Sequence, residues 1–142
     1  MARDMSADER REFLLEGTRT GKVATTRADG RPHVTPVWFT LDGDEIVFTT
    51  HETSLKAKAI RRDERICMCV DDQTSPYSYV MVEGRATLSD DLGELVRWAT
   101  AVGGRYMGAD RAEEFGARNG VPGELLVRIT PTRVVTRADM AD

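Results

Sequence analysis

The chain is organised around residues 49–65, whose sequence is TTHETSLKAKAIRRDER. We expect a strand to end and a helix to begin here, because Thr53 and Ser54 are residue types that cap helix N-termini. A helix start exposes unpaired N–H groups and a partial positive charge, and Lys56 follows it directly. The segment is therefore suited to hold a phosphate. A surface helix whose cations only face water is an equally simple interpretation.

Turn signals and hydrophobic patterns place strands on both sides of this segment. Before it, Asp29-Gly30 is a strong hairpin signal between two strands, and the turn at 42–44 leads into a third. Pro36 lies inside the second strand and has no N–H to donate. That strand is therefore an edge, or is bulged, or faces something other than a strand. The expected strands cover residues 21–27, 32–41, 45–50, 65–71, 77–88, 125–129 and 133–136.

Helices are expected at three further places. Ser6 and Glu9 fit a capping box and open a first helix. Asp90 or Asp91 caps a long amphipathic helix that Gly103-Gly104 ends, and a short charged helix covers 110–118. The long fifth strand, 77–88, carries Gly84 as a bulge or bend, while strand 65–71 is apolar throughout and expected to be buried on both faces.

The order of these elements predicts an α+β domain of about six mainly antiparallel strands with a few flanking helices. Twisted strands in so short a chain tend to close, because closure removes exposed edges. We expect a small β-barrel with helices packed over its openings. The chain of 142 residues has no repeat or linker, so residues 1–142 are expected to form a single domain.

Charge and hydropathy exclude several classes of partner. The formal net charge is −4, from 20 Lys and Arg against 24 Asp and Glu, which argues against nucleic acid because such binding needs a broad basic footprint. No apolar run approaches the roughly 18 residues of a membrane span. The polar N-terminus lacks the apolar core of a signal peptide. We therefore expect a cytoplasmic protein with neither a nucleic-acid nor a membrane partner.

The cysteines and the motifs give no sign of a metal or a nucleophile. Cys67 and Cys69 stand two residues apart and would share one face of a strand. A metal site needs about four ligands, and the chain has no second cysteine pair. We expect buried thiols and no metal. No metalloprotease, nucleophile-elbow or P-loop motif is present.

Two stretches together resemble a known family. They are residues 23–39, VATTRADGRPHVTPVWF, and residues 56–65, KAKAIRRDER; the entry to the fifth strand at 77–86, YSYVMVEGRA, adds to the likeness. They are similar to the pyridoxamine 5'-phosphate oxidase-like split β-barrel superfamily, the FMN-binding fold. Within it they look most like the flavin/deazaflavin oxidoreductases of group B, many of which bind coenzyme F420.

The resemblance implies a homodimer with the cofactor in a groove at the subunit interface. The positions that match the phosphate site are Lys56, Lys58, Thr49, Thr50 and His51. The positions that match the strand facing the ring are Thr35, Pro36 and Val37. The positions that match residues lining the pocket from the other subunit are Tyr77, Tyr79 and Val80.

Residue type and spacing, considered without the resemblance, rank these candidates differently. Lys56 is a good phosphate ligand on its own, because it lies at a helix N-terminus. Lys58, Arg61 and Arg62 fall on different faces of a helix, so we expect at most one to face the cofactor and the others to be solvated or paired with acidic neighbours. Trp38 either walls the pocket or belongs to the dimer interface.

The histidines and the other titratable residues are weaker candidates. His51 either lies near the cofactor or is an exposed strand end, and His33 is expected on the outer face of its strand. If a side chain protonates the product, the candidates are Tyr79, His51 and Arg105, which only their positions suggest.

We therefore expect a reductase that uses reduced F420 to deliver a hydride to an unsaturated small-molecule acceptor, with the cofactor performing the difficult step. Two alternatives are open. One is an FMN-dependent oxidoreductase of the same fold, since FMN and F420 share a ribityl phosphate. The other is a non-catalytic protein that binds a cofactor or a tetrapyrrole, because the sequence shows no strong acid–base constellation.

Overall fold

In the computed structural model, which describes residues 1–142, a seven-stranded antiparallel sheet runs through the molecule in the order β2-β1-β5-β6-β7-β4-β3. Its strands are β1 (Gly21–Thr26), β2 (Pro32–Val37), β3 (Thr40–Asp42), β4 (Glu45–His51), β5 (Arg65–Asp72), β6 (Ser78–Ser89) and β7 (Glu124–Arg137). The sheet curls around one core but does not close, because β2 and β3 are both edges although only Trp38 and Phe39 separate them in sequence. The expected α+β split barrel is confirmed.

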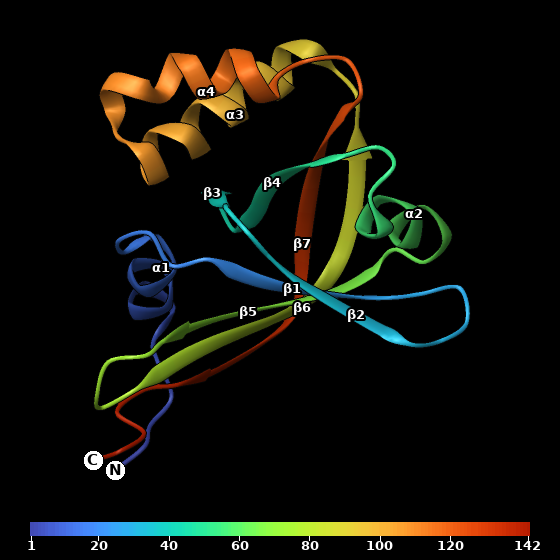
Figure 1. The fold of residues 1–142 in the computed structure, drawn as a ribbon. Helices are drawn as coiled ribbons and strands as arrows, with labels where there is room; N and C mark the ends of the chain where they lie inside the picture. The colour runs from blue at the N-terminus through green and yellow to red at the C-terminus, as the bar shows by residue number, and fades with distance from the viewer.

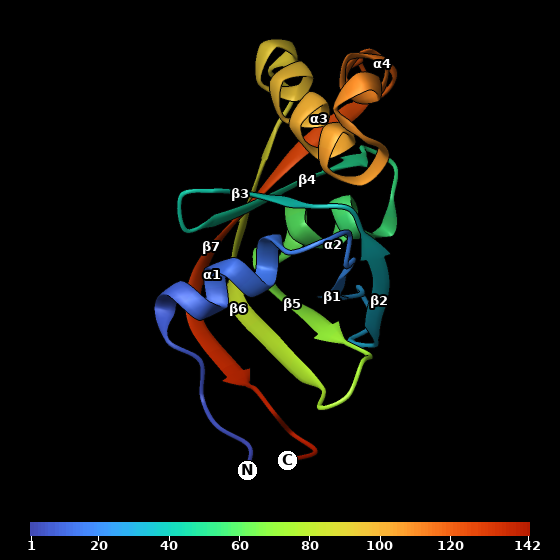
Figure 2. The same cartoon turned by 90° about the vertical axis from the view of Figure 1, so that its left-hand side faces the viewer.

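Four α-helices cover the curled sheet (Figures 1 and 2). They are α1 (Ala7–Leu15), α2 (Leu55–Arg62), α3 (Leu92–Met107) and α4 (Ala112–Asn119), with a 3₁₀ turn η1 (Ala109–Arg111) between the last two. The α3–α4 hairpin lies at one end of the molecule, and both termini lie together at the other. No helix is long and apolar enough to cross a membrane.

Local signals set the helix starts. The Ser6 side chain accepts a hydrogen bond from the Glu9 N–H, and Ser54 does the same for the Ala57 N–H. Apolar side chains of the strands fill the barrel interior, and α1 and α2 add Phe13, Leu14 and Ile60 to it. Burial of such side chains supplies most of the stability.

Strand β6 contains the expected irregularity. Its pairing with β7 shifts register between Glu83 and Gly84, which is a β-bulge. A Cβ at Gly84 would meet the Thr130 backbone and the Ile129 side chain, so the two strands approach closely there. β7 runs through Pro131 without a break, and the two expected strands at 125–129 and 133–136 are therefore one.

Three further expectations were wrong. The strand expected at 32–41 stops at Val37 and restarts at Thr40. β5 is not buried on both faces, because Cys67 and Cys69 are half-exposed on its outer face. His33 lies on the inner face: its Nδ1 is buried, and the residue pairs directly with buried Thr25.

Helix α3 does not end at Gly103-Gly104 as expected but continues to Met107. Gly103 instead allows α3 and α4 to pack closely, because a Cβ at this position would collide with the Phe115 side chain of α4. Gly116 approaches Thr100 in the same way. Gly108, at φ 105°, ends the helix.

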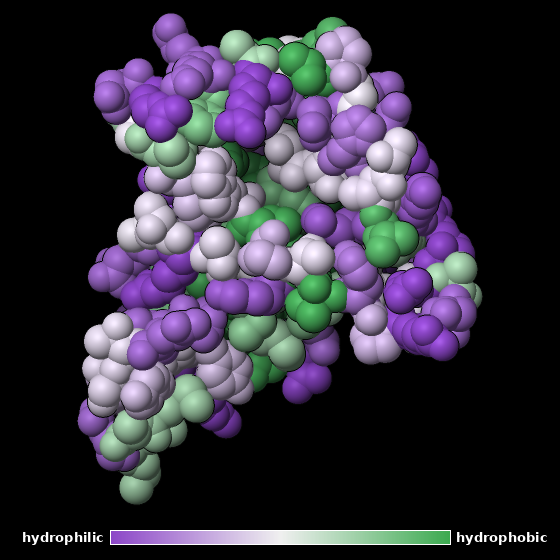
Figure 3. Space-filling model, viewed as in Figure 1, coloured by the Kyte–Doolittle hydropathy of each residue, from purple (hydrophilic) through white to green (hydrophobic).

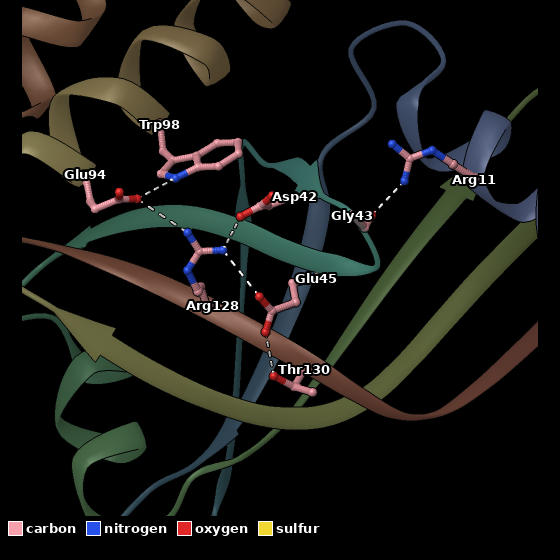
Figure 4. A network of polar contacts seen from close by, with 8 residues as sticks. All are labelled: Arg11, Asp42, Gly43, Glu45, Glu94, Trp98, Arg128 and Thr130. Carbon is pink, nitrogen blue, oxygen red and sulfur yellow. Dashed lines mark hydrogen bonds and ion pairs between the residues drawn. The ribbon is translucent and has the colours of Figure 1, made fainter.

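A polar network fastens α3 to the sheet (Figure 4). The Arg128 guanidinium on β7 donates to Asp42 at 2.6 Å and lies within 3.5 Å of carboxylate oxygens of Glu45 and Glu94. The Trp98 indole N–H donates to Glu94 at 3.0 Å. One cation thus joins carboxylates from β3, β4 and α3 above a small buried cluster of Val47, Leu95, Trp98 and Leu126.

We expect Arg128→Met to lower the free energy of unfolding by about 1 to 3 kcal/mol, because three neighbouring carboxylates lose their common donor. Urea unfolding followed by circular dichroism measures this. Arg27→Met is the control: Arg27 is exposed in the β1–β2 turn, and a change within about 0.5 kcal/mol is expected there. Equal effects of the two substitutions would contradict a stabilising role of the network.

Candidate functional site

A cavity of about 260 Å³ lies between the barrel and the α3–α4 hairpin. Figure 3 shows the surface hollowed at this place, between the hairpin and α2, with apolar atoms at the floor. The cavity is lined by β2, the link between β2 and β3, β4, α2, α3 and α4. The lining residues are Pro36, Val37, Trp38, Thr49, Thr50, Lys56, Ala99, Val102 and Asn119.

One end of the cavity is the N-terminus of α2. Ser54 caps the helix, and its hydroxyl lies 2.8 Å from the Thr50 hydroxyl of β4. The Ala57 N–H is bonded to this cap, whereas the N–H groups of Leu55 and Lys56 bond to no other backbone group. Free amides and the helix dipole together attract an anion.

The Lys56 ammonium lies at the same end without a partner. The side chain is half-buried, and no carboxylate forms an ion pair with it. Burial lowers its pKa below the usual lysine value, because desolvation disfavours the charged form. A cation that is desolvated but unpaired is stabilised when an anion binds beside it. The structure therefore supports Lys56 as the centre of an anion site.

Aromatic rings form the opposite wall. The Trp38 indole stacks on the Tyr106 ring at 5.1 Å between centroids and 3° between planes, and Phe115 of α4 lies tilted against it at 5.8 Å. Trp38 is 37% exposed. Trp38 thus lines the cavity, and its contact with a second subunit stays a prediction.

The link that carries Trp38 is held by α3. The Tyr106 hydroxyl accepts from the Phe39 N–H and donates to the Arg19 carbonyl. The Arg105 guanidinium donates to the carbonyls of Leu14, Gly17 and Phe39. Arg105, a candidate proton donor from sequence, does not line the cavity; its N–H groups bind backbone, and its contribution is to positioning.

Strand β2 presents a free edge to the cavity. Arg27 donates to the Arg31 carbonyl, and hydrogen-bonded pairs alternate in an antiparallel ladder. Every second residue of β2 therefore lies in a pair that is not hydrogen-bonded to β1. These residues are Pro32, Val34 and Pro36, and their backbone polar groups point away from β1. Of the three explanations for Pro36, the edge strand is the correct one. The Pro36 carbonyl is left to accept from a ligand.

The structure brings together six of the residues expected from sequence: Pro36, Val37, Trp38, Thr49, Thr50 and Lys56. Thr35 lies just beside them on the inner face of β2, and its hydroxyl is buried without a partner. Lys58 lines a different groove, with Arg27 and Arg62. Arg61 and Arg62 each donate to a backbone carbonyl.

The remaining candidates lie outside this cavity. His51 is exposed, and its Nδ1 lies 2.7 Å from the Thr53 hydroxyl. Tyr77 and Tyr79 lie at the start of β6 and are at least partly exposed, and their contact with a second subunit stays a prediction. Val80 is buried in the core of its own chain, so its side chain cannot line a partner's pocket as expected.

Sequence reasoning missed the residues that the hairpin contributes: Ala99, Val102 and Asn119. Ala99 and Val102 look like ordinary members of an apolar helix stripe. Asn119 reads as a helix stop before Gly120. Nothing in the sequence distinguishes a stripe that faces a cavity from one that faces a core.

Comparisons with known proteins point to one family. The family model described as pyridoxamine 5'-phosphate oxidase matches residues 6–138. An F420H(2)-dependent biliverdin reductase of Mycobacterium tuberculosis is 29% identical over 136 residues, which are 96% of this chain and 91% of the relative.

Two solved structures are similar at comparable identity. A conserved hypothetical protein of Mycobacterium tuberculosis superposes with a TM-score of 0.85 at 30% identity, over 96% of this chain and 87% of the other. A structure named F420 reductase gives a TM-score of 0.68 at 28% identity, over 87% and 94%.

We expect Lys56→Met to weaken binding of a phosphate-bearing cofactor by about 1.5 to 3 kcal/mol, the range for a hydrogen bond to a charged group. The same change should raise the melting temperature of the cofactor-free protein, because it removes a desolvated charge.

Binding by the wild type should fall as the pH rises through the lowered pKa of Lys56, since only the ammonium attracts the anion.

Titration and thermal unfolding of Lys56→Met and Lys58→Met measure these effects side by side. Because Lys58 lines a separate groove, its substitution should cost far less affinity. A larger loss for Lys58→Met would place the anion in that other groove.

Proposed function

This chain belongs to the pyridoxamine 5'-phosphate oxidase family, and we propose that it is an F420-dependent reductase acting on an unsaturated small molecule. One observation carries the proposal: a half-buried, unpaired Lys56 lies at a helix N-terminus beside a platform formed by β2 and Trp38. Relatives at 28 and 29% identity that are named for F420 support the choice of cofactor. We place the reaction in the cytoplasm.

The residues of the cavity fit a cofactor with a phosphate and a flat ring. Lys56 and the free N–H groups of α2 would hold the phosphate. Pro36, Val37 and Trp38 would support the ring, with the Pro36 carbonyl as a hydrogen-bond acceptor. When bound, the reduced deazaflavin supplies the hydride. The work of the chain is to hold the ring, exclude water and place the acceptor at close range.

In a single chain, no side chain of the cavity is available to donate a proton to the product. Lys56 is the only titratable side chain that lines the cavity, and its charge is required for the phosphate. His51, Tyr79 and Arg105 do not line it. We propose that solvent protonates the product, unless a second copy brings Tyr79 to the cavity.

We further propose a homodimer that completes the site. A cavity of about 260 Å³ is smaller than the roughly 300 to 1,000 Å³ of ordinary ligand pockets. A tricyclic cofactor with its side chain therefore needs further walls. The outer sheet face carries half-exposed or exposed apolar side chains in adjacent strands: Ala24, Val34, Cys69, Met81 and Val135. Such a face is suited to a second copy, whose Tyr77 and Tyr79 would line the cavity.

Titration of the pure protein with F420 and with FMN tests the cofactor. We expect F420 to bind and to quench tryptophan fluorescence, because Trp38 lies in the cavity wall. We expect reduced F420 to be reoxidised in a panel of unsaturated acceptors that includes biliverdin, the acceptor named for the mycobacterial relative. The absorbance of the oxidised cofactor reports turnover.

Three results would change the proposal. Binding of FMN alone would make the protein an FMN-dependent oxidoreductase. Tight F420 binding without turnover of any acceptor would favour a protein that only binds the cofactor. Copurification of FMN with the protein would count against F420.

The dimer has its own test. We expect Met81→Asp to convert a dimer into a folded monomer in sedimentation experiments, because a carboxylate would be buried on the apolar face without a partner. F420 affinity should fall with it. Thr87→Asp, an exposed position farther along β6, should leave the dimer intact. A monomeric wild-type protein would refute the second-copy contribution.

A further inference from the structure

Asn119 is the one residue of α4 that lines the cavity. It is the last residue of the helix and is half-buried. Its carboxamide takes part in none of the hydrogen bonds of the fold, although it faces the same space as Lys56 and Thr49. The amide is therefore free to bind a ligand in the cavity.

Three uncommitted side-chain donors thus converge from three elements. Lys56 comes from α2, Thr49 from β4 and Asn119 from α4. No acidic side chain lines the cavity, and the ammonium makes its potential positive. An anion accepts hydrogen bonds from all three groups at once, and the amide then presents its N–H₂ end rather than its carbonyl.

An anion bound in this way would also connect the α3–α4 hairpin to α2. Helix α4 packs chiefly on α3, through the close approach of Phe115 to Gly103 and of Gly116 to Thr100. Toward the barrel its aromatic contact is that of Phe115 with Trp38. An anion held by both Lys56 and Asn119 would add a second attachment, from α4 across the cavity to α2.

We propose that Asn119 is a ligand-binding residue that donates to the same anionic group as Lys56, so that an occupied cavity joins α4 to α2. This rests on the proposed function in one respect: the group is then the cofactor phosphate. The inference itself needs only a phosphate-like anion. Binding is expected to order the end of α4 and to slow amide hydrogen exchange there.

The test is a double-substitution cycle with Lys56→Ala and Asn119→Ala, titrated with F420 and separately with inorganic phosphate. Asn119→Ala should weaken both ligands about tenfold. The double variant should lose less than the product of the two single losses, because the groups share one anion. Asn119→Asp should lose more than Asn119→Ala, since its carboxylate repels the ligand.

Glu113→Gln is the matched control, because Glu113 is exposed at the start of the same helix and lies outside the cavity. Its affinities should match the wild type. The melting temperature of each unliganded variant is measured in parallel, so that loss of fold is separated from loss of binding. Hydrogen exchange of 115–120 should slow on ligand addition in the wild type and not in Asn119→Ala.

The outcomes separate the two proposals. If phosphate binding depends on Asn119 but F420 does not bind, the inference stands and the proposed function fails. If F420 binds equally well to Asn119→Ala and wild type, the inference is overturned and the proposed function stands. If neither ligand binds the wild type, both are wrong.

Discussion

The cavity depends on how the backbone of Trp38 and Phe39 finds its hydrogen-bond partners. These two residues connect two edge strands of the sheet, so no ladder pairs their N–H and C=O groups. Each buried group left unpaired would cost about 1 to 3 kcal/mol. Tyr106 and Arg105 bind both polar backbone groups of Phe39. Because both side chains come from the last turn of α3, the same contacts fix α3, the tryptophan wall and the roof of the cavity.

The sequence predicted the parts of the fold that local interactions determine. Short-range signals were sufficient where one or two neighbouring residues decide the structure. The capping Ser6 and Ser54 start their helices, Gly30 takes φ 88° in the first hairpin, and Gly84 lies at the bulge. The position of Lys56 at a helix start followed from the same local reasoning. The strand residues that meet Lys56 at the cavity, Pro36, Val37, Thr49 and Thr50, were named by the family resemblance and not by such local signals.

Features set by distant contacts were not predictable in this way. The glycine pair at 103 and 104 reads as a helix stop, but its lack of side chains leaves space for Phe115 and Ala112 of the next helix. Arg105 was a candidate for chemistry because its charge was visible and its three carbonyl partners, 66 to 91 residues away in sequence, were not. Asn119 was missed because its place at the cavity follows from how α4 folds back over α3.

Electrostatics shows why Lys56 differs from the other cations near it. Arg65 pairs with Asp63, whose pKa its hydrogen bonds hold at about 2, and Arg85 pairs with Glu64. In a chain of net charge −4, an anion site requires a local excess of positive charge. Here the excess arises because the acidic residues that follow α2 are bound to arginines outside the cavity. Lys56 is left half-buried and unpaired, at a cost to the stability of the free protein that a bound anion would recover. A residue whose charge destabilises the empty fold is more simply explained by binding than by folding.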